Sequence, residues 1–169
     1  INFPAANPAV ADITSTRIIN PGIHNGIKLT GNQTLTLRGT GVYVFSLVNN
    51  KNSNTFVLDF QNSPNGRISI YVHGDMTLGK LKLNTINGGD ASRIYTEVHG
   101  TGVGTSKYTF EISNGSSGSK SKWLGTVYAP YAAINVGSGT GGTDYTGALW
   151  SGTQVNVNSG VTVNYYPLE

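Results

Sequence analysis

Cysteine is absent from this 169-residue chain, and charged residues make up only 11% of it. Without cysteine the chain cannot form a disulfide-stapled scaffold or a metal site built on thiolates. Eleven basic and eight acidic residues leave a net charge of +3. This surplus is too small for the dense basic stripe of a nucleic-acid-binding protein, so we expect no nucleic-acid partner.

Long apolar runs are missing as well. The apolar stretches last only a few residues, so we expect no membrane insertion. The start, Ile1-Asn2-Phe3-Pro4, lacks the basic region and apolar core of a signal peptide, and we expect a mature or excised fragment. Ala, Leu, Glu, Lys and Arg are scarce, which argues against a helical bundle.

Gly, Thr, Asn and Ser supply 75 residues, about 44% of the chain, and apolar residues supply 37%. The apolar residues often recur with period two, which is typical of strands with one buried face and argues against disorder. The predicted strands are Gly26–Leu29, Thr34–Leu37, Val42–Leu47, Thr55–Phe60, Arg67–Val72, Leu81–Leu83, Arg93–Val98, Tyr108–Ile112, Trp123–Tyr128, Ala132–Val136, Tyr145–Trp150, Val155–Val157 and Val161–Tyr165.

Turn residues separate these strands about every 8–12 residues, a spacing that fits a β-sandwich or a β-solenoid. The strands are short, and Asn and Gly stand at the expected corners, as stacked coils require. Gly125-Thr126-Val127-Tyr128-Ala129 and Gly147-Ala148-Leu149-Trp150-Ser151 share one shape about 22 residues apart, a plausible coil length. We therefore predict a single all-β domain over residues 1–169, a parallel β-helix, with the β-sandwich as the alternative.

Both ends of such a solenoid need covering, because open coils expose unpaired strand edges. We expect an N-terminal cap within residues 1–25, with a short helix or loop over Asn7–Arg17. Tyr165 and Tyr166, followed by Pro167, are expected to close the other end. Polar segments at 49–54, 100–107, 114–122 and 137–144 are expected to protrude as loops.

Several segments in order resemble bacterial surface domains. Gly41-Val42-Tyr43-Val44-Phe45 precedes Ile68-Ser69-Ile70-Tyr71-Val72-His73-Gly74-Asp75, and Gly125-Thr126-Val127-Tyr128-Ala129-Pro130 precedes the last predicted coils. This order, over roughly residues 26–165, is similar to adhesin domains of the choice-of-anchor A type and related polymer-like domains of secreted proteins. The resemblance implies a β-solenoid outside the cell, acting as a stalk or adhesive head, and it supplies no catalytic residues.

Catalytic motifs are scarce, because the eight carboxylates are scattered singly along the chain. His73 with Asp75, and Glu97 with His99, lie two residues apart and would share one face of a strand. Such pairs can act as acid and base or bind a metal. With no third ligand or nucleophile motif nearby, we expect an exposed turn and no catalytic residues.

Candidate ligand-binding residues lie in the last third of the chain. Tyr131, Tyr145 and Trp150 can offer aromatic faces to sugars or proteins, although Trp150 and Trp123 also suit a coil interior or a solenoid end. Asp144 beside a Gly-rich run is a candidate ligand for Ca²⁺, and no other cofactor is expected.

The predicted function is adhesion or surface structure: a secreted or cell-surface module that binds a glycan or a neighbouring cell's surface protein, or serves as a stalk. A polysaccharide-active β-helix enzyme is the alternative from another class. Ice binding is a minor alternative, because it needs Thr-x-Thr on successive coils. In a credible strand the chain has this spacing once, at Thr34 and Thr36, with Thr14 and Thr16 in a poorer context.

Overall fold

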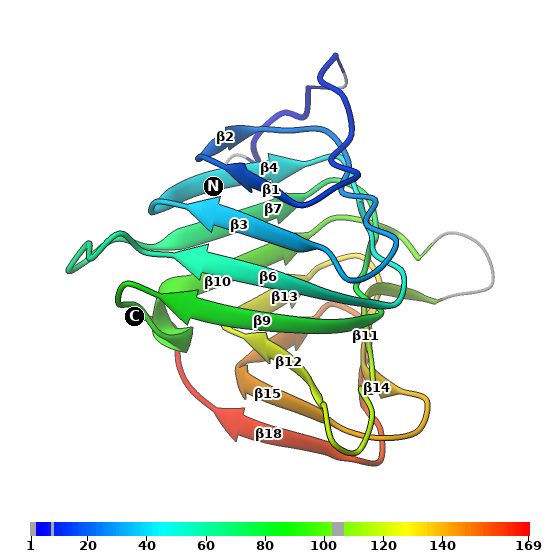
Figure 1. Ribbon diagram of the computed structural model, residues 1–169. Coiled ribbons are helices and arrows are strands. Elements are labelled where there is room, and N and C mark those ends of the chain that lie inside the picture. Colours follow the sequence, from blue (N-terminus) through cyan, green and yellow to red (C-terminus); the bar gives the residue numbers. More distant parts are fainter. Residues whose placement is uncertain (1–2, 8, 103–106) are drawn as a thin grey trace.

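The computed structural model describes residues 3–7, 9–102 and 107–169, and in them three sheets of parallel strands stack into a β-solenoid of about six coils (Figure 1). The seven-stranded wall contains β1 (Arg17–Ile19), β3 (Thr34–Arg38), β6 (Ser53–Asp59), β9 (Lys80–Ile86), β12 (Ser121–Leu124), β15 (Thr143–Gly147) and β18 (Val161–Tyr165). The six-stranded wall contains β2 (Gly22–Ile23), β4 (Gly41–Phe45), β7 (Ile68–Val72), β10 (Ile94–Val98), β13 (Thr126–Ala129) and β16 (Leu149–Ser151). The five-stranded wall contains β5 (Val48–Asn49), β8 (Met76–Thr77), β11 (Tyr108–Ser113), β14 (Ala133–Ser138) and β17 (Val155–Val157).

The predicted parallel β-helix is confirmed, and the β-sandwich is wrong. Each wall pairs a strand of one coil with the equivalent strand of the next, and all of these pairings are parallel. A sandwich would instead be built from antiparallel pairs. The predicted repeat is confirmed too, because Val127 in β13 lies directly opposite Leu149 in β16, the equivalent position of the repeated segment.

The core is a column of apolar side chains inside the coils. In β7, for example, Ile68, Ile70 and Val72 are buried, whereas Ser69 and Tyr71 face outward. Successive side chains in a strand point to opposite faces, so the period of two in the sequence divides each wall into a core face and a solvent face. The same alternation therefore decides which side chains reach a ligand.

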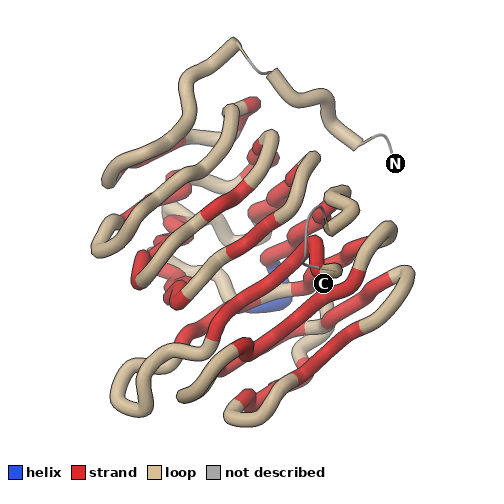
Figure 2. The backbone as a smooth tube through the Cα atoms, turned by 90° about the vertical axis from the view of Figure 1, so that its right-hand side faces the viewer, coloured by secondary structure: helices blue, strands red, loops and turns tan. Residues whose placement is uncertain are grey.

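The coils of the solenoid already begin within residues 1–25, the segment that was predicted to hold an N-terminal cap. Ile13 forms a parallel bridge with Ile27, and β1 and β2 already belong to the walls. Within the expected helix or loop over Asn7–Arg17, the described residues before Arg17 form a loop, and Arg17 begins β1. Figure 2 shows the N-terminal segment passing over this end of the stack, where Ile13 and Ile19 are buried.

The opposite end is open, contrary to the expected closure by Tyr165 and Tyr166. The inward-facing Val157 and Val163 of the last coil are 50% and 46% exposed, and Tyr165 is 75% exposed. The chain then turns back along the side of the coils, where the Glu169 amide donates to the Ser92 carbonyl beside the short helix η1 (Ala91–Arg93). Strands β16, β17 and β18 consequently end their three walls with unpaired edges in the described structure.

Among the described residues there is no helix with the length and apolar character needed to cross a bilayer.

Candidate functional site

The outer face of the six-stranded wall carries a row of aromatic side chains. Strand register places Tyr71 beside Glu97, Glu97 beside Tyr128, and Tyr128 beside Trp150 on four successive coils. We call Tyr71, Tyr128 and Trp150 the aromatic row, and Glu97 lies between Tyr71 and Tyr128 in it. Tyr128 and Trp150 are 38% and 62% exposed, and Tyr131, just beyond β13, is 60% exposed. These rings offer apolar area to a partner beside polar groups that can form hydrogen bonds.

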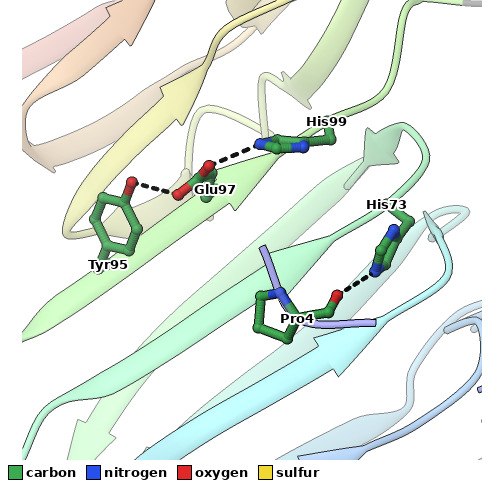
Figure 3. Close-up of polar contacts among 5 residues, drawn as sticks. All are labelled: Pro4, His73, Tyr95, Glu97 and His99. Carbon is green, nitrogen blue, oxygen red and sulfur yellow. Dashed lines mark hydrogen bonds and ion pairs between the residues drawn. The ribbon is translucent and has the colours of Figure 1, made fainter. Parts of the chain in front are cut away.

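A hydrogen-bonded chain of three side chains crosses this face along β10 and the residue that follows it (Figure 3). The Tyr95 hydroxyl donates to Glu97 Oε2 at 2.7 Å, and His99 Nε2 lies 2.7 Å from Glu97 Oε1. Their alternating positions put all three side chains on one face of the strand. Burial and the bond to Glu97 raise the pKa of the Tyr95 hydroxyl well above its ordinary value. Glu97 is therefore held between a neutral donor and an imidazole.

The N-terminal segment lies across part of the same face. Phe3 stacks on His99 with ring centroids 3.6 Å apart, and it meets Tyr71 and His73 edge-on. The Pro4 carbonyl oxygen lies 2.6 Å from Nε2 of His73 (Figure 3). The segment thus covers the histidine end of the face and leaves Tyr128 and Trp150 exposed.

A hollow of about 490 Å³ lies beside the two histidines, at the corner between the six-stranded and five-stranded walls. His73, Asp75, His99 and Thr101 are among the residues that line it. The Asp75 carboxylate accepts the Gly102 N–H at 2.9 Å. Both predicted His–carboxylate pairs therefore border one region, although they come from two different coils of the solenoid.

The four predicted ligand residues do not form one site. Trp150 and Tyr131 lie on the outer face of the six-stranded wall, and the Tyr131 ring meets His99 edge-on at 5.0 Å. Tyr145 is fully buried, with its hydroxyl 2.7 Å from the Gly125 carbonyl oxygen, so it offers no surface to a ligand. Asp144 belongs to the seven-stranded wall.

Asp144 bonds to Lys120 at 3.0 Å, so a cation would compete there with an ammonium group. In the parts of the chain that the structure describes, no three His, Asp or Glu side chains are grouped so that they could hold a metal ion. Of the segment 100–107, which was expected to protrude as a loop, residues 103–106 lie outside the described residues.

The predicted threonine face is also placed by the register. Thr34 and Thr36 of β3 lie beside Thr55 and Val57 of β6. In the next coil, Lys82 follows Thr55. These rows mix threonine with apolar and charged side chains. The Thr-x-Thr spacing of Thr34 and Thr36, which ice binding requires on successive coils, is therefore not repeated in β6 or β9.

Three residues of this surface were not predicted as ligand contacts from the sequence: Tyr71, Tyr95 and Tyr128. The available signal was the alternation within the predicted strands Arg67–Val72 and Arg93–Val98, which already puts Tyr71 and Tyr95 opposite the apolar positions. Their neighbourhood, in contrast, depends on which coil stacks on which. No protein-family model, no curated protein and no solved structure matches this chain.

Proposed function

We propose that this chain is a binding module of a secreted or cell-surface protein, and that the outer face of its six-stranded wall binds a glycan. The single observation that carries this proposal is the aromatic row, whose Tyr128 and Trp150 rings are exposed side by side on a rigid sheet. Rigid aromatic rings with polar neighbours suit sugar rings, because they bury apolar area without losing side-chain freedom.

An extracellular setting agrees with other features of the chain. The resemblance to adhesin domains of the choice-of-anchor A type supports it, as does a surface rich in Asn, Thr and Ser. A stacked solenoid also suits a stalk that holds a binding face away from the cell, because each coil contacts only its neighbours and extends the molecule along one axis.

A glycan array followed by affinity measurement tests the proposal. We expect the protein to bind a subset of glycans, and Trp150→Ala and Tyr128→Ala to weaken that binding at least about tenfold, as expected for loss of a central aromatic anchor. Tyr165→Ala is the matched control, because it removes an aromatic ring that is 75% exposed on another wall. Absence of glycan binding, or an equal loss in the control, would overturn the proposal.

Polysaccharide cleavage is the second candidate function, and the Tyr95–Glu97–His99 chain favours it. A carboxylate held beside an imidazole can transfer protons at a glycosidic bond. A reducing-sugar assay on the glycans that bind separates the two functions. Sugar release by the protein that disappears in Glu97→Gln and in His99→Ala, while binding remains, would support cleavage over binding alone.

A further inference from the structure

A second candidate site lies on the seven-stranded wall, away from the aromatic row. A groove of about 510 Å³ lies across the outer faces of β3, β6 and β9, which are neighbours in Figure 1, and is bordered by the segment before β12. The residues that line it include Gln33, Asn54, Lys80, Lys82, Lys120 and Ser121. We call it the lysine groove.

The groove concentrates positive charge. Lys80 and Lys82 are exposed and lie two residues apart on one face of β9. Lys82 also lies directly opposite Lys122 of β12 in the parallel ladder. Like charges placed directly opposite each other destabilise a sheet, and the ladder offers one carboxylate, Asp144 opposite Lys122 on its other side, against these two lysines. Asp144 offsets part of this charge through Lys120, and among the described residues no Asp or Glu lines the groove itself.

The remaining lining limits the kind of anion. Apart from the lysines and Gly115, all of the lining side chains in the described structure are hydroxyls or primary amides. This lining therefore offers no aromatic ring for nucleobases to stack on and no aliphatic side chain for the apolar residues of a peptide or a lipid tail. Hydroxyls and amides instead match a ligand that is rich in hydroxyl groups, and the ammonium groups match its carboxylates or sulfates.

The walls of the groove are held in place before any ligand arrives. Asn54 accepts the Gln33 N–H at 3.0 Å, and its own amide donates to the Lys51 carbonyl. The loop on the other side is fixed by backbone bonds from Gly115 and Ser121 to the Gly142 carbonyl oxygen. Because these side chains and loops are already ordered, the groove loses little conformational entropy when a ligand binds.

We infer that the lysine groove binds an acidic polysaccharide, carrying either uronate or sulfate groups, through Lys80, Lys82 and Lys120. This site is separate from the aromatic row, and its failure would leave the proposed function intact. Binding at one wall can therefore be removed without changing binding at the other.

Calorimetric titration with polygalacturonate, heparin and neutral dextran tests the inference. We expect the protein to bind one or both acidic polymers and not dextran, with affinity falling as ionic strength rises to about 0.15 M and beyond. The Lys80→Gln/Lys82→Gln double variant should bind at least about tenfold more weakly, while its glycan-array profile at the aromatic row is unchanged. The preferred polymer distinguishes uronate from sulfate.

The control is the Arg67→Gln/Lys107→Gln double variant, which removes the same charge from two exposed residues outside the groove. It should bind within about twofold of the unmodified protein, provided that thermal unfolding shows all three proteins folded. Equal losses in the two double variants would mean nonspecific attraction to a basic protein and would overturn the inference. Tighter binding to duplex DNA than to either acidic polymer would also overturn it.

Discussion

Tyr145 and Trp150 illustrate how a single position within a coil decides what an aromatic residue does. Tyr145 occupies an inward position of β15 and is fully buried, whereas Trp150 occupies an outward position of β16 and is 62% exposed. The sequence offered both residues as candidate ligand contacts, with a coil interior or a solenoid end as the other reading for Trp150. The difference in exposure comes from the pleat, because side chains along each strand point alternately into the core and into solvent.

The buried hydroxyl of Tyr145 leads to a prediction about alkaline stability. Burial raises the pKa of this hydroxyl well above its ordinary value of 10.0, so the neutral form is favoured in the folded protein. The resulting stabilisation is complete below about pH 10 and is lost as the pH rises further, because unfolded tyrosines ionise there first. Urea unfolding should therefore give a free energy of unfolding that falls above this pH.

Tyr145→Phe separates the contribution of the hydroxyl's hydrogen bond to stability from the effect of its ionisation at high pH. At pH 7 it should lower the free energy of unfolding by about 1–3 kcal/mol, since the bond to the Gly125 carbonyl is lost. Above pH 10 the stability of the variant should fall less steeply than that of the unmodified protein. The exposed Tyr165→Phe serves as control, and parallel pH profiles for all three proteins would contradict the explanation.

At the scale of the elements, most strands could be predicted from the sequence, but two corners inside predicted strands could not. The predicted strand Trp123–Tyr128 is in fact two strands, β12 and β13, separated by a corner at Gly125. Tyr145–Trp150 divides in the same way into β15 and β16. A glycine between apolar residues reads as a weak strand position, and only the closure of the coil turns it into a bend.

The shortest strands were missed for a related reason. β5 and β8 contain two residues each, too few to display any alternation, and they are strands because the coils on either side supply partners. The predicted strand Gly26–Leu29 shows the reverse case. Its one paired residue is Ile27, which bridges Ile13 and Val48 in adjacent coils.

Gly125→Ala tests the corner between β12 and β13. Gly125 has φ +102°, a conformation that side chains disfavour, and an added Cβ would lie 2.5 Å from the Ile94 carbonyl oxygen of the neighbouring coil. We expect the substitution to lower the free energy of unfolding by more than about 2 kcal/mol. Gly118→Ala, where nothing lies within 4 Å, should change it by less than about 0.5 kcal/mol. Similar urea midpoints for the two variants would contradict this account.

At the scale of the whole molecule, the candidate site could not be predicted because the coils differ in length. Arg17 lies opposite Leu35, whereas Lys82 lies opposite Lys122, so the second of these coils is more than twice as long as the first. Loops of different length between the walls cause this difference. The sequence alternation predicts that Tyr71 faces outward, but the register that places it beside Glu97 depends on the size of the intervening loops.

The two ends of the solenoid should also differ in local stability. In a linear array each coil is stabilised by its neighbours, and β18 has a neighbour on one side only, whereas β9 lies between β6 and β12. Hydrogen–deuterium exchange should therefore be faster for the amides of β16, β17 and β18 than for those of β6, β9 and β10. Equal protection in these two groups would show that something covers the open end in solution.

In-register stacking also gives the molecule a built-in unit of length. Adjacent strands of a sheet lie about 4.8 Å apart, so Tyr71 and Trp150, three strands apart, stand about 14 Å from each other along the solenoid axis. That interval is fixed by backbone hydrogen bonds and not by the side chains themselves. The span over which an extended polymer contacts the wall therefore grows in steps of one strand spacing, and inserting or deleting a coil would change it by one step.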